Sequence, residues 1–206
     1  YNRVQESLRP KGTHCSDLVL CVRQSAFRQL DPKTPSLATF GFYVDGNTSD
    51  RNLKNLFVPS SPENIRGIWI TPDALDEEGN IWEFKATRSN SGLSSHFGKQ
   101  LAYYLALSGV KKGFLLVRRL NRKYPKKGEP DTWHPFEIYS LEMTPELKHQ
   151  TIDEIQVRMM ALELALEEKN PMLAPDVITD PDLNWLCQSC LWKEPCWSKA
   201  RGTSVS

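Results

Sequence analysis

The most informative stretch of the sequence is ITPDALDEEGNIWEFK, which occupies residues 70–85. Both ends of this stretch are apolar, and the segment DEEGN between them is typical of a turn. We therefore expect a β-hairpin in which Asp73 lies roughly opposite Glu83. Glu83 and Lys85 are two residues apart, so their side chains should leave the same face of the strand, with Phe84 buried on the other face. The hairpin thus predicts that two carboxylates and one ammonium group converge.

Apolar patterns on both sides of the hairpin indicate an α/β domain. Helical spacing predicts helices over residues 16–30, 50–57, 94–108 and 144–170, and apolar runs predict strands over residues 65–70, 81–86, 112–119 and 136–141. This order favours a mixed central β-sheet flanked by helices. Because 206 residues can bury one substantial core and no linker divides the chain, we expect a single domain over residues 1–206.

The overall charge is uninformative about a nucleic-acid partner. The 26 basic residues nearly balance the 25 acidic ones, so binding to a polyanion would depend on local patches. The densest basic segment, residues 118–127, lies between the last two predicted strands, and it is equally well explained as a solvated loop. The apolar runs are too short to cross a bilayer and the N-terminus lacks a signal-peptide pattern, so we expect a cytoplasmic protein without a membrane partner.

Two carboxylates and a lysine are the groups that phosphodiester hydrolysis requires. Carboxylate oxygens are suitable ligands for Mg²⁺ or Mn²⁺, the metal stabilises charge on the phosphoryl group, and a nearby cation can act on the attacking water. The pattern of Glu83 and Lys85 is weak support by itself, because such a pair is usually an exposed face of a strand. The interpretation therefore depends on the surrounding motifs.

The wider pattern resembles the PD-(D/E)XK nuclease superfamily. Pro-Asp at residues 72–73 followed by Glu-Phe-Lys at residues 83–85 matches the signature of that superfamily. Gln100 and Tyr104, one helical turn apart, resemble the Q-x-x-x-Y motif of its RecB-like branch. The chain is therefore similar to RecB-like iron-sulfur nucleases of the CRISPR-associated exonuclease family. This resemblance implies a restriction-endonuclease-like catalytic core, which we expect over residues 44–142.

The resemblance implies a metal site built on the hairpin. Asp73, Glu83 and the carbonyl oxygen of Phe84 would bind the Mg²⁺ or Mn²⁺ ion. Asp50, four residues after a glycine, occupies the position at which this branch places a further ligand, although it could equally begin the following helix as an N-cap. Asp76 is the alternative to Asp73, but it falls at the predicted turn.

The resemblance also implies catalytic and substrate-binding roles. Lys85 would orient or activate the attacking water. Gln100 and Tyr104 would position the substrate, with His96 one turn earlier on the same helix. The substrate would be DNA, cleaved by an exonuclease at single-stranded or frayed ends, and the expected protein partners belong to DNA repair or CRISPR adaptation. The alternatives are a non-catalytic DNA-binding or scaffold module, against which the intact catalytic set argues, and a sequence-specific restriction endonuclease, against which the short chain argues.

The five cysteines form two groups. Cys187, Cys190 and Cys196 have the spacing C-x2-C-x5-C, whereas Cys15 and Cys21 lie near the other end of the chain. Three clustered thiolates in a reducing compartment indicate metal ligation rather than disulfides, and they require a fourth ligand. Zinc ions and iron-sulfur clusters both accept four thiolates, so the cysteines themselves leave both possibilities open.

The resemblance to iron-sulfur nucleases selects between these possibilities. It implies a 4Fe-4S cluster held by Cys21 and the three C-terminal cysteines, with Cys15 as a spare thiol. The cluster would join residues 16–31 to residues 180–198 as a structural staple, and a zinc-stapled endonuclease is the alternative. We expect the tryptophans interleaved with these cysteines to shield the cluster; they are Trp185, Trp192 and Trp197.

Overall fold

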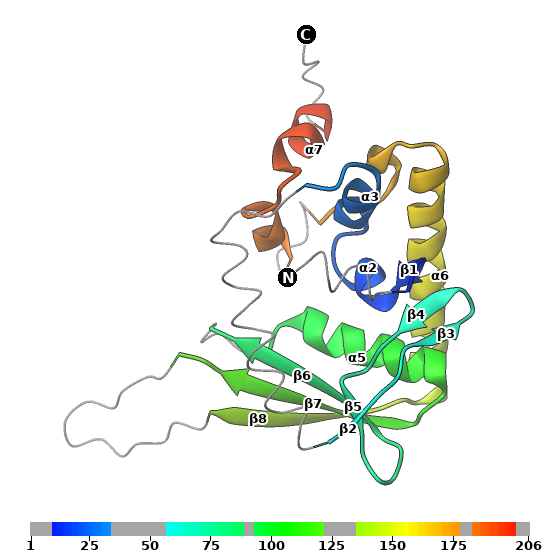
Figure 1. The fold of residues 1–206 in the computed structure, drawn as a ribbon, viewed down its shortest axis with the longest axis vertical. Helices are drawn as coiled ribbons and strands as arrows, with labels where there is room; N and C mark the ends of the chain where they lie inside the picture. The colour runs from blue at the N-terminus through cyan, green and yellow to red at the C-terminus, as the bar shows by residue number, and fades with distance from the viewer. Residues whose placement is uncertain (1–9, 34–56, 89–92, 122–134, 178–182, 201–206) are drawn as a thin grey trace, which may run out of the picture.

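The computed structural model describes residues 10–33, 57–88, 93–121, 135–177 and 183–200. These residues form a β-sheet with a helix on its face, and a helical lobe beside them (Figure 1). The long helix α6 (Pro145–Glu167) runs from the sheet to the lobe and contacts helices in both. The helix expected over residues 50–57 lies outside the described residues, apart from its last one.

The larger β-sheet has five strands in the order β2-β5-β6-β7-β8. These strands are β2 (Val58–Pro59), β5 (Ala74–Leu75), β6 (Ile81–Thr87), β7 (Lys112–Arg119) and β8 (Phe136–Glu142). β6 and β7 are parallel and are connected through α5 (Ser95–Ser108), whereas the other neighbouring pairs are antiparallel. The sheet is therefore mixed and flanked by helices, which confirms the predicted α/β fold class.

A smaller sheet corrects the predicted first strand of the hairpin. It contains β1 (Thr13–His14), β4 (Ile68–Ile70) and β3 (Glu63–Ile65), in the order β1-β4-β3. The chain turns back at Arg66 and Gly67, whose φ angles of 55° and 84° are left-handed values typical of a tight hairpin turn. Residues 65–70 are therefore not one strand, and the antiparallel partner of β6 is the short β5.

The predicted N-terminal helix is divided into two. The two helices are α2 (Cys15–Val19) and α3 (Val22–Leu30), and Cys21 caps the start of α3. The Arg158 guanidinium on α6 donates hydrogen bonds to three consecutive carbonyl oxygens at the end of α2, those of Leu18, Val19 and Leu20. A helix end leaves such carbonyl groups without partners inside the helix, so Arg158 stabilises the break that positions Cys21.

The main core lies between the larger sheet and the helices that cover one of its faces. Gly113 lets α5 approach the sheet closely, because a Cβ there would lie 2.8 Å from Leu101 Cδ1 and 3.1 Å from the Ile81 carbonyl oxygen. Register pairs Glu83 with Leu115 of β7, whose side chain belongs to this core, so Glu83 faces α5. The opposite face of the sheet has a smaller apolar cluster.

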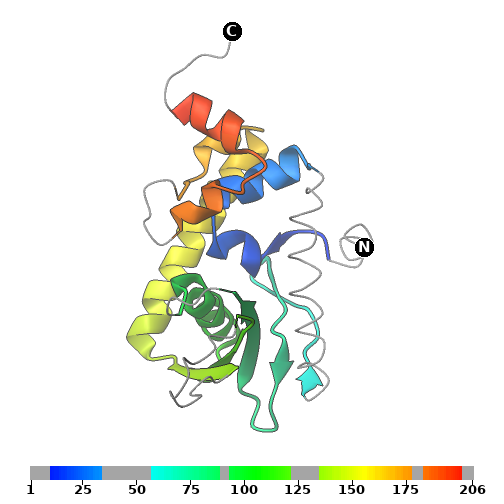
Figure 2. The same cartoon turned by 90° about the vertical axis from the view of Figure 1, so that its left-hand side faces the viewer.

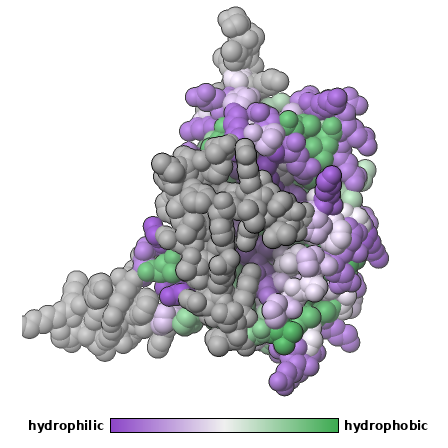
Figure 3. All heavy atoms as spheres, viewed as in Figure 1, coloured by the Kyte–Doolittle hydropathy of each residue, from purple (hydrophilic) through white to green (hydrophobic). Residues whose placement is uncertain are grey.

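The helical lobe combines both ends of the described chain. After α6 come the short helices η1 (Pro171–Leu173) and η2 (Asn184–Cys187) and then α7 (Lys193–Ala200), which lie beside α2 and α3 (Figure 2). No helix in the described ranges is long and apolar enough to cross a membrane. On the face seen in Figure 3, hydrophilic residues separate the hydrophobic patches.

Candidate active site

β6 presents Glu83 and Lys85 toward α5, as their spacing predicts. The Lys85 ammonium nitrogen lies 2.5 Å from Oε1 of Glu83, and Glu83 is only 2% exposed. A buried carboxylate is costly unless a cation and hydrogen bonds compensate its charge. Lys85 supplies that charge, so the two side chains form one electrostatic unit on the strand.

α5 extends this unit through a chain of hydrogen bonds. Lys85 Nζ donates to Oε1 of Gln100 (2.9 Å), and Gln100 Nε2 donates to the Tyr104 hydroxyl (2.8 Å). The Tyr104 hydroxyl in turn donates to the carbonyl oxygen of Thr71 (3.3 Å). Burial, followed by the charge of Glu83, raises the pKa of Tyr104, so its hydroxyl stays protonated as a donor. The structure thus brings the Q-x-x-x-Y residues together with the predicted catalytic lysine.

Asp73 lies just before β5, at the position the hairpin predicts. The register pairs Ala74 with Trp82, so Asp73 falls opposite Glu83. Its Oδ2 accepts a hydrogen bond from the backbone N–H of Phe84 (2.8 Å), which fixes the carboxylate against β6. The side chain of Phe84 is buried on the other face of the sheet, as expected.

Asp76, the alternative carboxylate, is committed to the hairpin turn. Its carboxylate accepts hydrogen bonds from the backbone N–H groups of Glu78 (3.1 Å) and Asn80 (2.8 Å) and from the indole N–H of Trp82 (3.1 Å). Burial is the largest single influence and raises the pKa of Asp76, but the hydrogen bonds from Trp82, Asn80 and Glu78 together outweigh it, so the pKa is lowered. The geometry therefore favours Asp73 over Asp76 as the partner of Glu83.

The chemical type of the ligand atoms at this site is suitable for a hard divalent cation. Asp73 and Glu83 supply carboxylate oxygens, the ligand type that Mg²⁺ and Mn²⁺ prefer. No group of three or more His, Cys, Asp or Glu side chains that could hold a metal ion is found within the described ranges. Asp50, the third expected carboxylate, lies outside them, and the role of the Phe84 carbonyl stays a prediction.

Aromatic rings extend from the lysine along the start of α5. The ring centroid of Phe97 lies 6.0 Å from Lys85 Nζ and 4.3 Å from the ring of His96. The His96 ring lies 5.9 Å from that of Trp185, on η2. Burial, followed by the charge of Lys85, lowers the pKa of His96 to about 4, so this imidazole is uncharged at neutral pH. The C-terminal segment therefore reaches the edge of the candidate active site.

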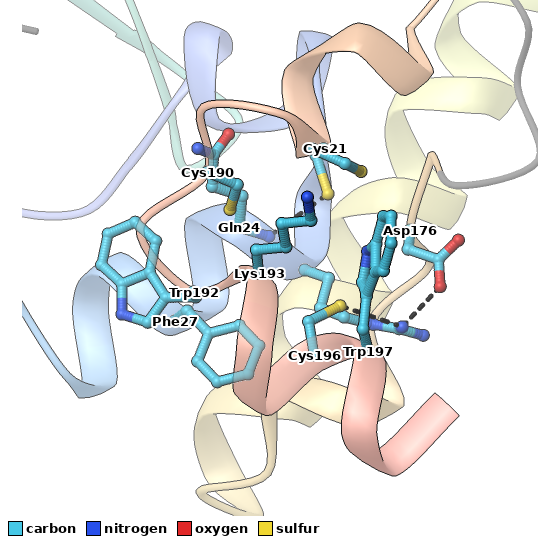
Figure 4. Close-up of a pocket in the computed structure, with 11 residues that line it drawn as sticks. Cys21, Gln24, Phe27, Asp176, Cys190, Trp192, Lys193, Cys196 and Trp197 are labelled. Atoms are coloured by element: carbon cyan, nitrogen blue, oxygen red, sulfur yellow. Dashed lines mark hydrogen bonds and ion pairs between the residues drawn. The ribbon is translucent and has the colours of Figure 1, made fainter. Parts of the chain in front are cut away.

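The cysteines expected to bind a cluster surround one pocket in the helical lobe (Figure 4). Its lining includes Cys21 at the start of α3 and the three C-terminal cysteines, Cys187, Cys190 and Cys196. Burial first, and then the three neighbouring thiols, raise the pKa of Cys21 to about 11 despite a hydrogen bond from the backbone of Gln24. Thiolates are the ligand type that zinc ions and iron-sulfur clusters accept, but the described residues contain no group of three or more potential ligands that could hold a metal ion, so the bound centre stays a prediction.

Two cations border this pocket, and the sequence analysis singled out neither. Arg23 Nη1 lies 3.6 Å from the sulfur of Cys196 and 2.5 Å from Oδ2 of Asp176. Lys193 extends among the cysteines in Figure 4, with its ammonium 4.6 Å from the ring centroid of Trp197. The available signal was their sequence position, since each is a basic residue within three positions of a cysteine. Nearby positive charge favours the thiolate form of cysteine, so Lys193 and Arg23, which is also paired with Asp176, would help these cysteines to act as ligands.

Cys15 and Trp185 lie apart from the cysteine pocket. Cys15 is 1% exposed in the main core, where burial, followed by the charge of Glu83, raises its pKa. Trp192 and Trp197 line the pocket, as expected, but Trp185 does not. The ring of Trp185 lies 5.9 Å from that of His96, and its expected shielding of a cluster stays a prediction.

The predicted basic segment is only partly described, up to residue 121. Within it, Arg119 makes two hydrogen bonds to the carboxylate of Glu137 (2.9 and 2.8 Å), which also accepts one from Tyr139 (2.6 Å). The hydrogen bonds from Arg119, and then from Tyr139, lower the pKa of Glu137 to about 2. Arg119 is thus committed to an ion pair within the sheet.

The fold resembles that of solved nuclease structures. No protein-family model matches the chain, and neither does any curated protein. The crystal structure of SSO0001 superposes with a TM-score of 0.59 at 19% identity, covering 96% of this chain and 93% of that one. The alkaline exonuclease LHK-Exo from Laribacter hongkongensis gives a TM-score of 0.54 at 12% identity, covering 76% and 90% of the two chains.

A phage-related exonuclease from Haemophilus somnus 129PT gives a TM-score of 0.50 at 10% identity, covering 81% of this chain and all of that one (100%). LHK-Exo has also been solved in complex with dAMP. At such low identities the likeness concerns the fold.

Proposed function

We propose that this protein is a Mg²⁺- or Mn²⁺-dependent DNA nuclease that acts as an exonuclease on single-stranded ends. The observation that carries the proposal is the position of Lys85, whose ammonium contacts both Glu83 (2.5 Å) and Gln100 (2.9 Å) on the face of the sheet where Asp73 lies opposite Glu83. Two fold neighbours that are exonucleases, one of them solved with the nucleotide dAMP, add support.

The proposed site residues have different roles in hydrolysis. Asp73 and Glu83 would hold the cation, with Asp50 and the carbonyl oxygen of Phe84 as further proposed ligands. When bound, the cation would neutralise phosphate charge and favour attack at phosphorus. Lys85 would present an ammonium N–H to the attacking water and to the phosphate oxygens.

Gln100 and Tyr104 would serve this lysine as positioning residues. Gln100 accepts from Lys85 and donates to Tyr104, whose hydroxyl is fixed by the Thr71 carbonyl. Because the lysine side chain has four rotatable bonds, holding its end from α5 restricts the ammonium to one location. A catalytic group that is already held in the reactive orientation lowers the activation barrier, because no entropy is lost in orienting it during the reaction.

Digestion of end-labelled single-stranded DNA with Mg²⁺ or Mn²⁺ tests the catalytic assignment. We expect Lys85→Ala to lower the cleavage rate by about a hundredfold or more while the protein stays folded. Lys99→Ala is the matched control, because Lys99 is on α5 but pairs with Glu154 of α6 (2.8 Å). In the same way Asp73→Asn should abolish cleavage and Asp76→Asn should retain it.

A folded Lys85→Ala protein that cuts at the parental rate would make the assignment wrong. If the parental protein binds DNA but cuts no substrate with either metal, the alternative of a non-catalytic DNA-binding or scaffold module replaces the nuclease. Cleavage of circular single strands would favour an endonuclease over an exonuclease.

A 4Fe-4S cluster on Cys21, Cys187, Cys190 and Cys196 is the second part of the proposal. Its support is that Cys21 and the three C-terminal cysteines, from two segments far apart in the sequence, line one pocket next to the guanidinium of Arg23. Iron, sulfide and zinc analysis of anaerobically purified protein tests it. Stoichiometric zinc without iron would replace the cluster by the zinc alternative.

A cytoplasmic location and partners from DNA repair or CRISPR adaptation belong to the same proposal. A reducing compartment keeps the thiols available for metal, and the motif resemblance is the support for the partners. Co-purification with the tagged chain tests the partners directly. Recovery of the chain alone from cells that contain such a pathway would remove them from the proposal.

A further inference from the structure

The cysteine-bearing segment places an exposed indole beside the candidate active site. Trp185, two residues before Cys187, is 45% exposed, and its ring lies 5.9 Å from that of His96. Trp192 behaves differently, since it is 4% exposed and donates its indole N–H to the carbonyl oxygen of Asp31 (2.9 Å). Trp192 is therefore buried within the lobe, whereas Trp185 is partly exposed to solvent next to His96.

Successive contacts connect the Lys85 ammonium to the ring of Trp185 through Phe97 and His96. At one end is the Lys85 ammonium, and then come the rings of Phe97 (6.0 Å), His96 and Trp185. Phe97 is partly buried and packs against the main core, and the His96 imidazole is uncharged at neutral pH, so the exposed flat ring in this group is that of Trp185. A nucleotide strand has complementary groups, with anionic phosphates and flat, uncharged bases.

We propose that Trp185 stacks against an unpaired base of the DNA strand while the strand's backbone lies at Lys85. This inference rests on the proposed nuclease function and names a substrate-positioning residue for it. Indole rings are large and rigid, and they stack on any base, so they hold single strands without sequence preference. In a duplex the neighbouring base pairs cover the faces of each base, so a stacking residue of this kind selects unpaired ends.

The test is a binding series in EDTA, which prevents metal-dependent cleavage. Oligonucleotides carry 2-aminopurine or an abasic site at successive positions from the end, and the proteins are the parental chain, Trp185→Ala, Trp185→Phe and Trp185→Leu. We expect Trp185→Ala and Trp185→Leu to weaken binding by about tenfold and Trp185→Phe to weaken it far less. At one position, an abasic site should abolish the difference in affinity between the parental protein and Trp185→Ala. The fluorescence of 2-aminopurine at that same position should be quenched only when residue 185 has a flat ring.

Phe136→Ala is the matched control, because Phe136 is also an exposed aromatic residue (44%) but lies on β8 with its side chain away from α5. It should leave affinity unchanged. Iron content and melting temperature are measured for each variant. If Trp185 only supported the structure of the lobe, its substitution would lower both. If Trp185→Ala fails to fold, the Leu and Phe variants still separate a flat ring from apolar bulk.

Three results would overturn the inference: parental affinity in folded Trp185→Leu, an equal loss of affinity for intact and all abasic strands, or a loss explained by lost iron. A parental protein that cleaves DNA but shows one of these results overturns only the role of Trp185. A parental protein that neither binds nor cleaves single strands overturns the proposed nuclease function as well.

Discussion

At the scale of single residues, burial decides which side chains at the site carry charge. Glu83 is enclosed with Lys85 as its counter-ion, whereas His96, one contact further out, loses its charge because burial and the same lysine both disfavour an imidazolium. The sequence predicts the first pair, because two residues on one strand face share an environment. It does not predict the state of His96, which depends on packing by residues distant in sequence.

The lowered pKa of His96 has a consequence for stability against pH. The unfolded chain binds a proton at this residue with the ordinary pKa of 6.5, whereas the folded protein binds it only near about 4. The stability that the neutral ring contributes is therefore present above pH 6.5 and is lost as the pH falls toward 4. We expect the melting temperature of His96→Gln to fall less steeply than that of the parental protein across this window.

Thermal melts at several pH values measure this effect. His149→Gln is the control, because the side chain of His149 on α6 is 81% exposed. The control should follow the parental curve. Parallel curves for the parental protein and His96→Gln would mean that the imidazole is already solvated in the folded state.

At the scale of elements, the sequence predicts the strands and helix whose patterns are local. β6, β7, β8 and α5 lie within one or two residues of the expected ranges, because alternation and helical spacing both persist over each of them. The division of the N-terminal helix at Cys21 was not predictable, because Arg158 reaches it from α6. The extra hairpin was missed because Arg66-Gly67 makes a turn too short to interrupt an apolar run visibly.

Two glycines test how closely α5 is packed. Gly113→Ala should destabilise the protein by about 1–3 kcal/mol, because the new methyl group would overlap Leu101 and the Ile81 carbonyl. Gly98→Ala, within α5 itself and with nothing within 4 Å of the new methyl group, should stabilise it by about 0.5–1 kcal/mol. Urea unfolding measures both. A neutral Gly113→Ala would show that α5 can move away from the sheet, and DNA cleavage should then be impaired through Gln100.

At the scale of the whole molecule, the two candidate sites differ in how far the sequence could predict them. The residues of the catalytic constellation lie between 71 and 104, so local patterns and a known signature place them together. The cysteine pocket joins segments 166 residues apart, from Cys21 to Cys187, and only the family resemblance connected them. The approach of Trp185 to His96 had no sequence signal, since it follows from how the lobe packs on α5.

If the proposed cluster is bound, its loss should loosen both ends of the chain. A cross-link that closes so long a loop stabilises the fold by up to about 5 kcal/mol in a chain-entropy estimate. We therefore expect Cys21→Ser, Cys187→Ser, Cys190→Ser and Cys196→Ser each to lose iron and to lower the melting temperature by several degrees or more. Metal analysis and calorimetry on the same samples measure the two effects.

Cys15→Ala is the control for these variants. Alanine suits this position better than serine, because Cys15 is buried in the main core, where a hydroxyl group would need a new partner. The control should keep its iron and lose little stability. If Cys15→Ala also loses its iron, Cys15 rather than Cys21 is the N-terminal ligand.

The parallel pairing of β6 and β7 through α5 also determines the order in which the chain can fold. These three elements lie within residues 81–119, so their contacts close short loops, and α2 packs mainly on α5; by contrast, α3 packs mainly on α6 and η1, which come much later in the chain. The apolar face of α3 therefore stays uncovered until α6 has formed, although α3 precedes the whole sheet in the sequence.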